Sequence, residues 1–160
     1  MGIINTLNIE ELKQQYRETG YVVIKNLLRD EVAQAAYDAL KNRVPWEFHY
    51  REMNTGRVGV VNPADLERLT PREIKRLVPT MATLKDNDFS FAYCRYTIPS
   101  GAADCPEPVR ILSDIFHYFN SDEYLGLLAD ITGDASGKEV STWCSRYDRN
   151  HHLSVHMDES

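Results

Sequence analysis

The chain has 160 residues, of which 42% are hydrophobic and 26% are charged, as in an ordinary globular domain. Its formal net charge is −6 and its acidic residues are scattered along the chain, which argues against a nucleic-acid partner, since such partners are bound through basic patches. No apolar run approaches the ~18 residues of a membrane span, and no apolar core follows a basic leader at the N-terminus. We therefore expect a single cytoplasmic domain over residues 1–160.

Helical support with one strand is predicted for residues 1–45. Asn8 is placed to cap a helix that ends at Gly20, and Asp30 to cap a second helix that reaches about residue 42. Between the two helices, the apolar run 21–24 is typical of a short buried strand.

Residues 46–138 are predicted to mix strands with helices. The expected elements are a hairpin over 46–61, a helix over 71–84, a strand over 89–98, a helix over 109–119, and a further helix between Asn120-Ser121 and Gly133. Aromatic stripes on strands mostly form core, but Arg95 or Tyr96 in the strand 89–98 is a candidate for a ligand contact. His49 either faces solvent or contacts a substrate. The cysteines follow no metal or redox spacing and are expected to be reduced packing residues: Cys94, Cys105 and Cys144.

The segment 139–160 carries the pattern from which a function can be argued. A strand is predicted from Val140 to Tyr147, then a turn, then a second strand from His152 to Asp158. In the second strand two sets of side chains alternate, one polar (His152, Ser154, His156 and Asp158) and one apolar (Leu153, Val155 and Met157). His156 and Asp158 therefore share a face and can hold one metal ion. His151 is expected on the face opposite to His152.

A His-x-Asp pair favours iron over zinc. The pair supplies two legs of the 2-His-1-carboxylate facial triad, which leaves positions open for a co-substrate and O₂. Zinc sites with short spacings more often use pairs of cysteines or the helical His-Glu-x-x-His. Two other interpretations stay open: a polar outer face of an edge strand, and a structural metal site that uses His152 with His156.

The arrangement of four residues in this segment resembles a motif of the prolyl-4-hydroxylase-like branch of the Fe(II)/2-oxoglutarate-dependent dioxygenases. In that family a strand ending in Tyr, a short loop, and a Leu before His-x-Asp recur together, and here they are Tyr147, Leu153, His156 and Asp158. The resemblance implies that His156 and Asp158 ligate Fe(II) and that Tyr147 binds 2-oxoglutarate. It also implies hydroxylation of an unactivated C–H bond in a prolyl residue, a free amino acid or a small metabolite, with ascorbate as a candidate auxiliary cofactor.

The resemblance further implies an α+β fold, in which N-terminal supporting helices precede the first strands of a double-stranded β-helix, or jelly roll. Members of the family also use a distal His and a basic residue for the far carboxylate of 2-oxoglutarate, both several strands beyond the His-x-Asp pair. Because closing a jelly roll takes about eight strands, we expect this chain to be part of a longer enzyme and to be inactive alone. The alternative is a non-catalytic binding or scaffold domain derived from such an oxygenase.

Overall fold

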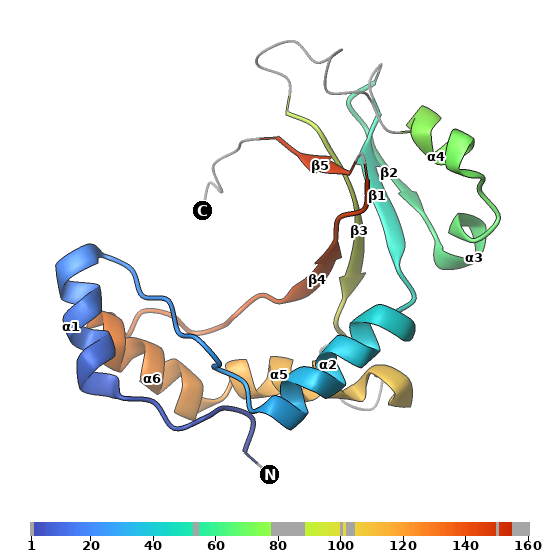
Figure 1. Ribbon diagram of the computed structural model, residues 1–160. Coiled ribbons are helices and arrows are strands. Elements are labelled where there is room, and N and C mark those ends of the chain that lie inside the picture. Colours follow the sequence, from blue (N-terminus) through green and yellow to red (C-terminus); the bar gives the residue numbers. More distant parts are fainter. Residues whose placement is uncertain are drawn as a thin grey trace. The chain divides into compact units, whose positions relative to one another are not determined.

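The computed structural model is an α+β structure that combines helices with a small antiparallel sheet of five strands (Figure 1). It describes residues 2–52, 55–77, 89–99, 101, 105–149 and 151–154. The predicted α+β class is confirmed, whereas the jelly roll is not confirmed by a sheet of this size. No helix within the described ranges is long and apolar enough to cross a membrane.

Contacts divide the chain into two compact units. The helical unit consists of Met1–Val44 and Ile98–Thr142, and the sheet unit of Pro45–Thr97 and Trp143–Ser160. The sheet unit therefore combines the middle of the sequence with the C-terminal segment that carries the predicted site.

Helix α1 (Ile9–Thr19) begins and ends where the sequence predicts. The Asn8 side chain accepts a hydrogen bond of 3.4 Å from the backbone N–H of Glu11, which satisfies one of the free donors at the helix start. Gly20 ends the helix with a φ of 76°, a left-handed conformation that glycine adopts without a steric penalty.

The core of the helical unit lies where α2 (Asp30–Asn42) contacts η3 (Glu107–Val109) and α5 (Arg110–Phe119). The buried side chains of this core are Val32, Ala36, Ala39, Val109, Leu112 and Ile115. Helix α6 (Asp122–Thr132) follows α5 and contacts α1. The predicted helices are confirmed, although Asp30 lies inside the first turn of α2 instead of capping it, where its charge favours the helix dipole.

The apolar run 21–24 is not a strand, contrary to the sequence prediction. Tyr21 and Val23 are 62% and 63% exposed. The nearest pairing is an isolated antiparallel bridge between Ile4 and Leu28. The prediction is wrong because β-branched residues form a strand only when a neighbouring segment pairs with their backbone N–H and C=O groups.

The sheet is centred on β3. Its strands are β1 (Glu47–Arg51), β2 (Val58–Val61), β3 (Phe91–Thr97), β4 (Trp143–Arg146) and β5 (His152–Leu153). Strand β1 pairs with one edge of β3 and with β2, while β4 and β5 pair in succession with the other edge of β3 (Figure 1). The strands expected within 46–61 and 89–98 are thus confirmed.

Two short helices, α3 (Pro63–Leu66) and α4 (Pro71–Leu77), follow β2. Asn62 caps α3 by accepting a hydrogen bond of 2.9 Å from the backbone N–H of Asp65. The predicted continuation of α4 to residue 84 lies outside the described residues.

The turn predicted between β4 and β5 would make them the two arms of a hairpin, but the strands do not pair with each other. Strand β4 pairs with Cys94–Thr97, and β5 pairs with Phe91 and Ala92. Residues 147–149 and 151 therefore lie off the edge of the sheet, opposite Tyr93, and the chain is paired with the same edge of β3 on either side of them, as in an enlarged β-bulge. Strand β4 is shorter than the predicted 140–147, and the predicted end of the second strand lies outside the described part of the chain.

The side chains of the sheet divide into a buried face and an exposed face, because residues opposite each other in antiparallel strands share a face and neighbours along a strand alternate. The buried face carries Phe48, Ala92, Cys94, Tyr96 and His152, each at most 8% exposed. The exposed face carries Val58, Val60, Phe89, Trp143, Tyr147 and Leu153, each at least 39% exposed.

Burial in β5 is the reverse of the predicted pattern. His152 is 7% exposed and Leu153 is 39% exposed, because His152 lies opposite Ala92 and the register with β3 decides the face. His151 also differs from the expectation, since its ring lies 5.2 Å from that of Phe48 on the buried face. His151 precedes β5, so the alternation of a strand does not apply to it.

Candidate functional site

Of the predicted site residues, the structure places Tyr147, whereas His156 and Asp158 lie outside the described residues. Tyr147 directly follows β4 and is half exposed on the exposed face. Its ring stacks on that of Tyr93, with 5.3 Å between the ring centroids and 22° between the planes. This stacking restrains the ring, while half of the residue stays exposed.

The Tyr147 hydroxyl is a hydrogen-bond donor at physiological pH. Burial, and then the neighbouring Tyr93, raise the pKa of Tyr147, so the phenol keeps its proton. Within the part of the chain that the structure describes, the hydroxyl makes no hydrogen bond.

Two arginines lie on the same exposed face. The Arg95 guanidinium lies 4.7 Å from the centre of the Trp143 ring, and that of Arg51 lies 5.7 Å from the Phe89 ring. The Nε atom of Arg95 is buried and has no hydrogen-bond partner among the residues described.

The other candidates from the middle region differ in position. Tyr96 is 8% exposed on the buried face, so it does not share the surface on which Arg95 and Tyr147 lie. His49 is half buried, and its Nε2 atom lies 3.1 Å from a carboxylate oxygen of Glu47. This contact makes His49 part of a local polar pair on β1.

A second group of polar side chains lies on the buried face, where residues between β4 and β5 meet β3. One ligand atom each from Cys94, Asp148 and His151 lies within 4.8 Å of the other two. The Arg146 guanidinium donates to the Cys94 thiol (3.6 Å) and to the Asp148 carboxylate (3.1 Å). Burial raises the pKa of the Cys94 thiol, which is therefore protonated in this arrangement.

This cluster was not predicted from the sequence. Cys94 and Asp148 are far apart in the chain and meet only because β4 pairs with β3 in one register. The spacing Asp148-x-x-His151 is the single local signal, and it is too common to identify a site.

The start of β5 is fixed by hydrogen bonds to the residue that precedes β3. The buried Ser90 hydroxyl lies 3.0 Å from Nε2 of His152, and the backbone N–H of Ser90 donates to the Ser154 hydroxyl (3.1 Å). The backbone N–H of Ser154 donates in turn to the Ser90 carbonyl (2.9 Å). The chain that enters the His-x-Asp segment is therefore held in one position up to Ser154.

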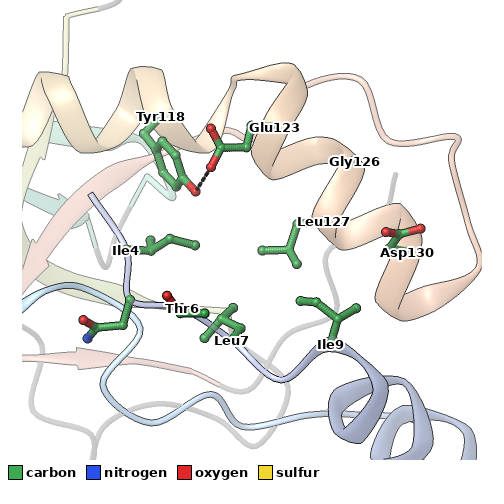
Figure 2. Close-up of a pocket in the computed structure, with 10 residues that line it drawn as sticks. Ile4, Thr6, Leu7, Ile9, Tyr118, Glu123, Gly126, Leu127 and Asp130 are labelled. Atoms are coloured by element: carbon green, nitrogen blue, oxygen red, sulfur yellow. Dashed lines mark hydrogen bonds between the residues drawn. The ribbon is translucent and has the colours of Figure 1, made fainter. Parts of the chain in front are cut away.

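The helical unit contains a separate hollow of about 630 Å³ (Figure 2). It is lined by Ile4, Asn5, Thr6, Leu7, Ile9, Tyr118, Glu123, Gly126, Leu127 and Asp130. The Tyr118 hydroxyl donates to the Glu123 carboxylate (3.0 Å), and burial together with this carboxylate raises the pKa of Tyr118 to about 12. The lining combines apolar side chains with two carboxylates but no pair of nucleophile and base, so it suggests no catalysis.

Comparisons with family models, curated proteins and solved structures find no match for this chain.

Proposed function

We propose that the chain carries the metal and co-substrate site of an Fe(II)- and 2-oxoglutarate-dependent dioxygenase. His156 and Asp158 ligate the iron, and Tyr147 donates a hydrogen bond to a carboxylate of 2-oxoglutarate. The bound iron supplies the oxidative chemistry, in which O₂ and 2-oxoglutarate give succinate, CO₂ and a hydroxylated C–H bond. The residues of this chain hold and orient the reactants.

The observation that carries the proposal is the state of Tyr147. Its ring is held against Tyr93, its phenol keeps its proton, and its hydroxyl makes no hydrogen bond within the described residues. A hydrogen bond to a carboxylate is charge-assisted, and it is about twice as strong as a bond between neutral groups. A fixed donor of this kind, just upstream of a His-x-Asp pair, suits a co-substrate that chelates the metal.

Arg95 supports the proposal through its charge. Tyr93 and Arg95 are two residues apart on β3, so Arg95 lies about 7 Å along the strand from the residue on which Tyr147 stacks. 2-Oxoglutarate is a dianion and needs a cation where it leaves water. We propose that Arg95 provides the nearest positive charge for its second carboxylate.

The substrate surface follows from the aromatic side chains beside Tyr147. The rings of Phe89, Phe91 and Tyr93 lie in a row on the exposed face, with centroids 5.7 and 5.8 Å apart. Aromatic faces pack well against the ring of a proline. We therefore propose a prolyl residue as the first substrate class and a free amino acid or small metabolite as the second.

For His156 and Asp158 to reach the face on which Tyr147 lies, the chain between His152 and His156 must depart from regular strand alternation. Strict alternation from His152 would carry His156 and Asp158 to the buried face, whereas Tyr147 lies on the exposed face. One irregular residue in between, such as a β-bulge, would turn the following side chains to the face of Tyr147. A metal-bound structure in which His152 and His156 share a face would contradict this part of the proposal.

Tryptophan fluorescence provides the test, because the two tryptophans differ in position. Trp143 is 46% exposed on the exposed face, and Trp46 is 8% exposed. Titrating 2-oxoglutarate into the protein with Fe(II) in the absence of O₂ is expected to quench the fluorescence to a plateau. The quenching is expected to disappear in Trp143→Phe and in Asp158→Ala, and to remain in the control variant Glu139→Ala.

Quenching that Asp158→Ala leaves unchanged, or that Trp143→Phe leaves in place, would contradict the proposal. Glu139 is a suitable control because it is an exposed acidic residue that precedes β4 and belongs to the helical unit.

A non-catalytic binding or scaffold domain is the second candidate, and the large apolar side chains gathered on the exposed face favour it. The two candidates differ in the same titration, since a scaffold domain shows no metal-dependent response to 2-oxoglutarate.

A further inference from the structure

We infer that Cys94, Asp148 and His151 form a second metal site, which takes a thiophilic divalent ion of the Zn²⁺ type. This site is separate from the proposed iron site and does not depend on it, because it shares no ligand with His156 or Asp158.

The spacing of the three ligand atoms suits one ion. They lie within 4.8 Å of one another. An ion at about 2.0–2.3 Å from each atom in tetrahedral geometry would bring them to about 3.5 Å apart. The ligand atoms must approach one another by about 1 Å to reach this spacing. Side-chain rotation can provide this movement, because Asp148 and His151 lie outside the strands and only Cys94 lies in one.

The donor set selects the class of metal. A thiolate, an imidazole and a carboxylate together suit Zn²⁺ or Co²⁺, whereas Mg²⁺ and Ca²⁺ prefer oxygen ligands alone. On binding, the Cys94 thiol releases its proton to solvent, and three protein ligands leave a fourth position for water.

The side chain of Arg146 shows that the cluster already attracts positive charge. Its guanidinium donates to the Cys94 thiol (3.6 Å) and to the Asp148 carboxylate (3.1 Å), so it contacts two of the three metal ligands. A metal ion must displace these contacts. The guanidinium can keep its position over the Trp46 ring, whose centre is 5.2 Å away.

A bound metal would join two parts of the sheet unit. Cys94 lies in the middle of β3, and the other two ligands lie in the loop between β4 and β5, where the backbone N–H of His151 donates to the Asp148 carbonyl (2.9 Å). The metal would thus hold the loop that follows Tyr147 against the central strand.

Cobalt provides the test, since Co²⁺ bound to a thiolate gives a charge-transfer band in the near ultraviolet that nitrogen and oxygen ligands do not give. We expect Co²⁺ to produce this band at one equivalent and Zn²⁺ to remove it. Cys94→Ser is expected to abolish the band, while Cys144→Ser keeps it, and Cys144 is a matched control because it is a half-buried thiol on β4.

Two further variants keep the test independent of folding. His151→Gln changes a loop residue and is expected to weaken Co²⁺ binding at least tenfold, whereas Arg146→Gln removes the competing cation and is expected to tighten binding. His156→Ala is expected to leave the band unchanged, which separates this site from the proposed iron site.

The inference is overturned by the absence of a thiolate band in the unsubstituted protein. A band that persists in Cys94→Ser, or one whose Co²⁺ affinity does not respond to His151→Gln, overturns it equally.

Discussion

Tyr147 combines a ring that stacks on Tyr93 with a hydroxyl that makes no hydrogen bond among the described residues. Replacing it with phenylalanine keeps the stacking on Tyr93 and removes only the donor. We expect Tyr147→Phe to weaken 2-oxoglutarate binding by about 0.5–1.5 kcal/mol, or about two- to tenfold in the dissociation constant, and by more if the bond is charge-assisted. The titration of Trp143 fluorescence measures this change.

Tyr118→Phe is the control for that substitution. Tyr118 lies in the helical unit, so its replacement is expected to leave the affinity for 2-oxoglutarate unchanged. An unchanged dissociation constant in Tyr147→Phe would assign Tyr147 a purely structural role.

The buried contact between Ser90 and His152 stabilises the start of β5. Ser90 is 3% exposed, and its hydroxyl lies 3.0 Å from Nε2 of His152. Ser90→Ala is expected to lower the free energy of unfolding by about 0.5–1.5 kcal/mol, the usual value of one buried hydrogen bond. Urea denaturation measures the change, and the exposed Ser145→Ala should stay within about 0.5 kcal/mol of the unsubstituted protein. Equal stability of the two variants would show that the contact contributes nothing.

At the level of single residues, the sequence was informative where the determinant is local. Asn8 and Gly20 cap the two ends of α1 as expected, because a cap acts on residues within one turn. The position of Tyr147 at the end of a strand was also predictable. The meeting of Cys94 with Asp148 was not, because it depends on the register between two strands that are distant in sequence.

Among the helices, α6 offers a matched pair of glycines. A Cβ atom at Gly126 would meet no heavy atom within 4 Å, while Gly133 ends the helix at a φ of 77°. Gly126→Ala is expected to raise the free energy of unfolding by about 0.5–1 kcal/mol, because alanine has the better helix propensity. Gly133→Ala is expected to lower it by about 1–2 kcal/mol, since the left-handed conformation disfavours a side chain.

Urea denaturation of both variants provides the measurement. A destabilising Gly126→Ala would mean that the hollow beside α6 (Figure 2) is filled by closer packing of the N-terminal segment.

The contact between α5 and α6 gives a pH dependence. Burial and the Glu123 carboxylate raise the pKa of Tyr118 to about 12, from about 10 for an ordinary tyrosine. The folded state therefore holds this proton more tightly, and the stability that it contributes is complete below pH 10 and is lost as the pH rises to about 12. Ultraviolet titration of the phenolates should show a late step that Tyr118→Phe removes and Glu123→Gln moves to lower pH. Titration curves that coincide for all three proteins would contradict this assignment.

At the level of elements, helices were predicted better than strand pairing. The backbone hydrogen bonds of a helix join residues four positions apart, so caps and periodicity are sufficient to predict α1, α5 and α6. A strand depends on a partner, which the run 21–24 lacks. The same dependence explains why β4 and β5 follow each other along β3 instead of pairing.

For the sheet unit as a whole, the central feature is one sheet with two unlike faces. The exposed face carries apolar, aromatic and cationic side chains around Tyr147, as expected of residues that line a binding site. A double-stranded β-helix places a second sheet against such a face. We propose that the five strands described here are part of that architecture.

The most direct test of the central claim is anaerobic addition of Fe(II) and 2-oxoglutarate to the chain, followed by visible absorption. Chelation of the metal by 2-oxoglutarate gives a charge-transfer band, because an electron of Fe(II) is promoted to the keto acid. His156, Asp158 and the chelating oxygens of 2-oxoglutarate are expected to hold the iron for this measurement, although turnover is not expected of the chain alone. We predict that this band forms with the unsubstituted protein, falls below about a tenth in His156→Ala and in Asp158→Ala, and persists in His117→Ala, where the exposed histidine lies on α5. No band in the unsubstituted protein, or an undiminished band in both His156→Ala and Asp158→Ala, would contradict the account.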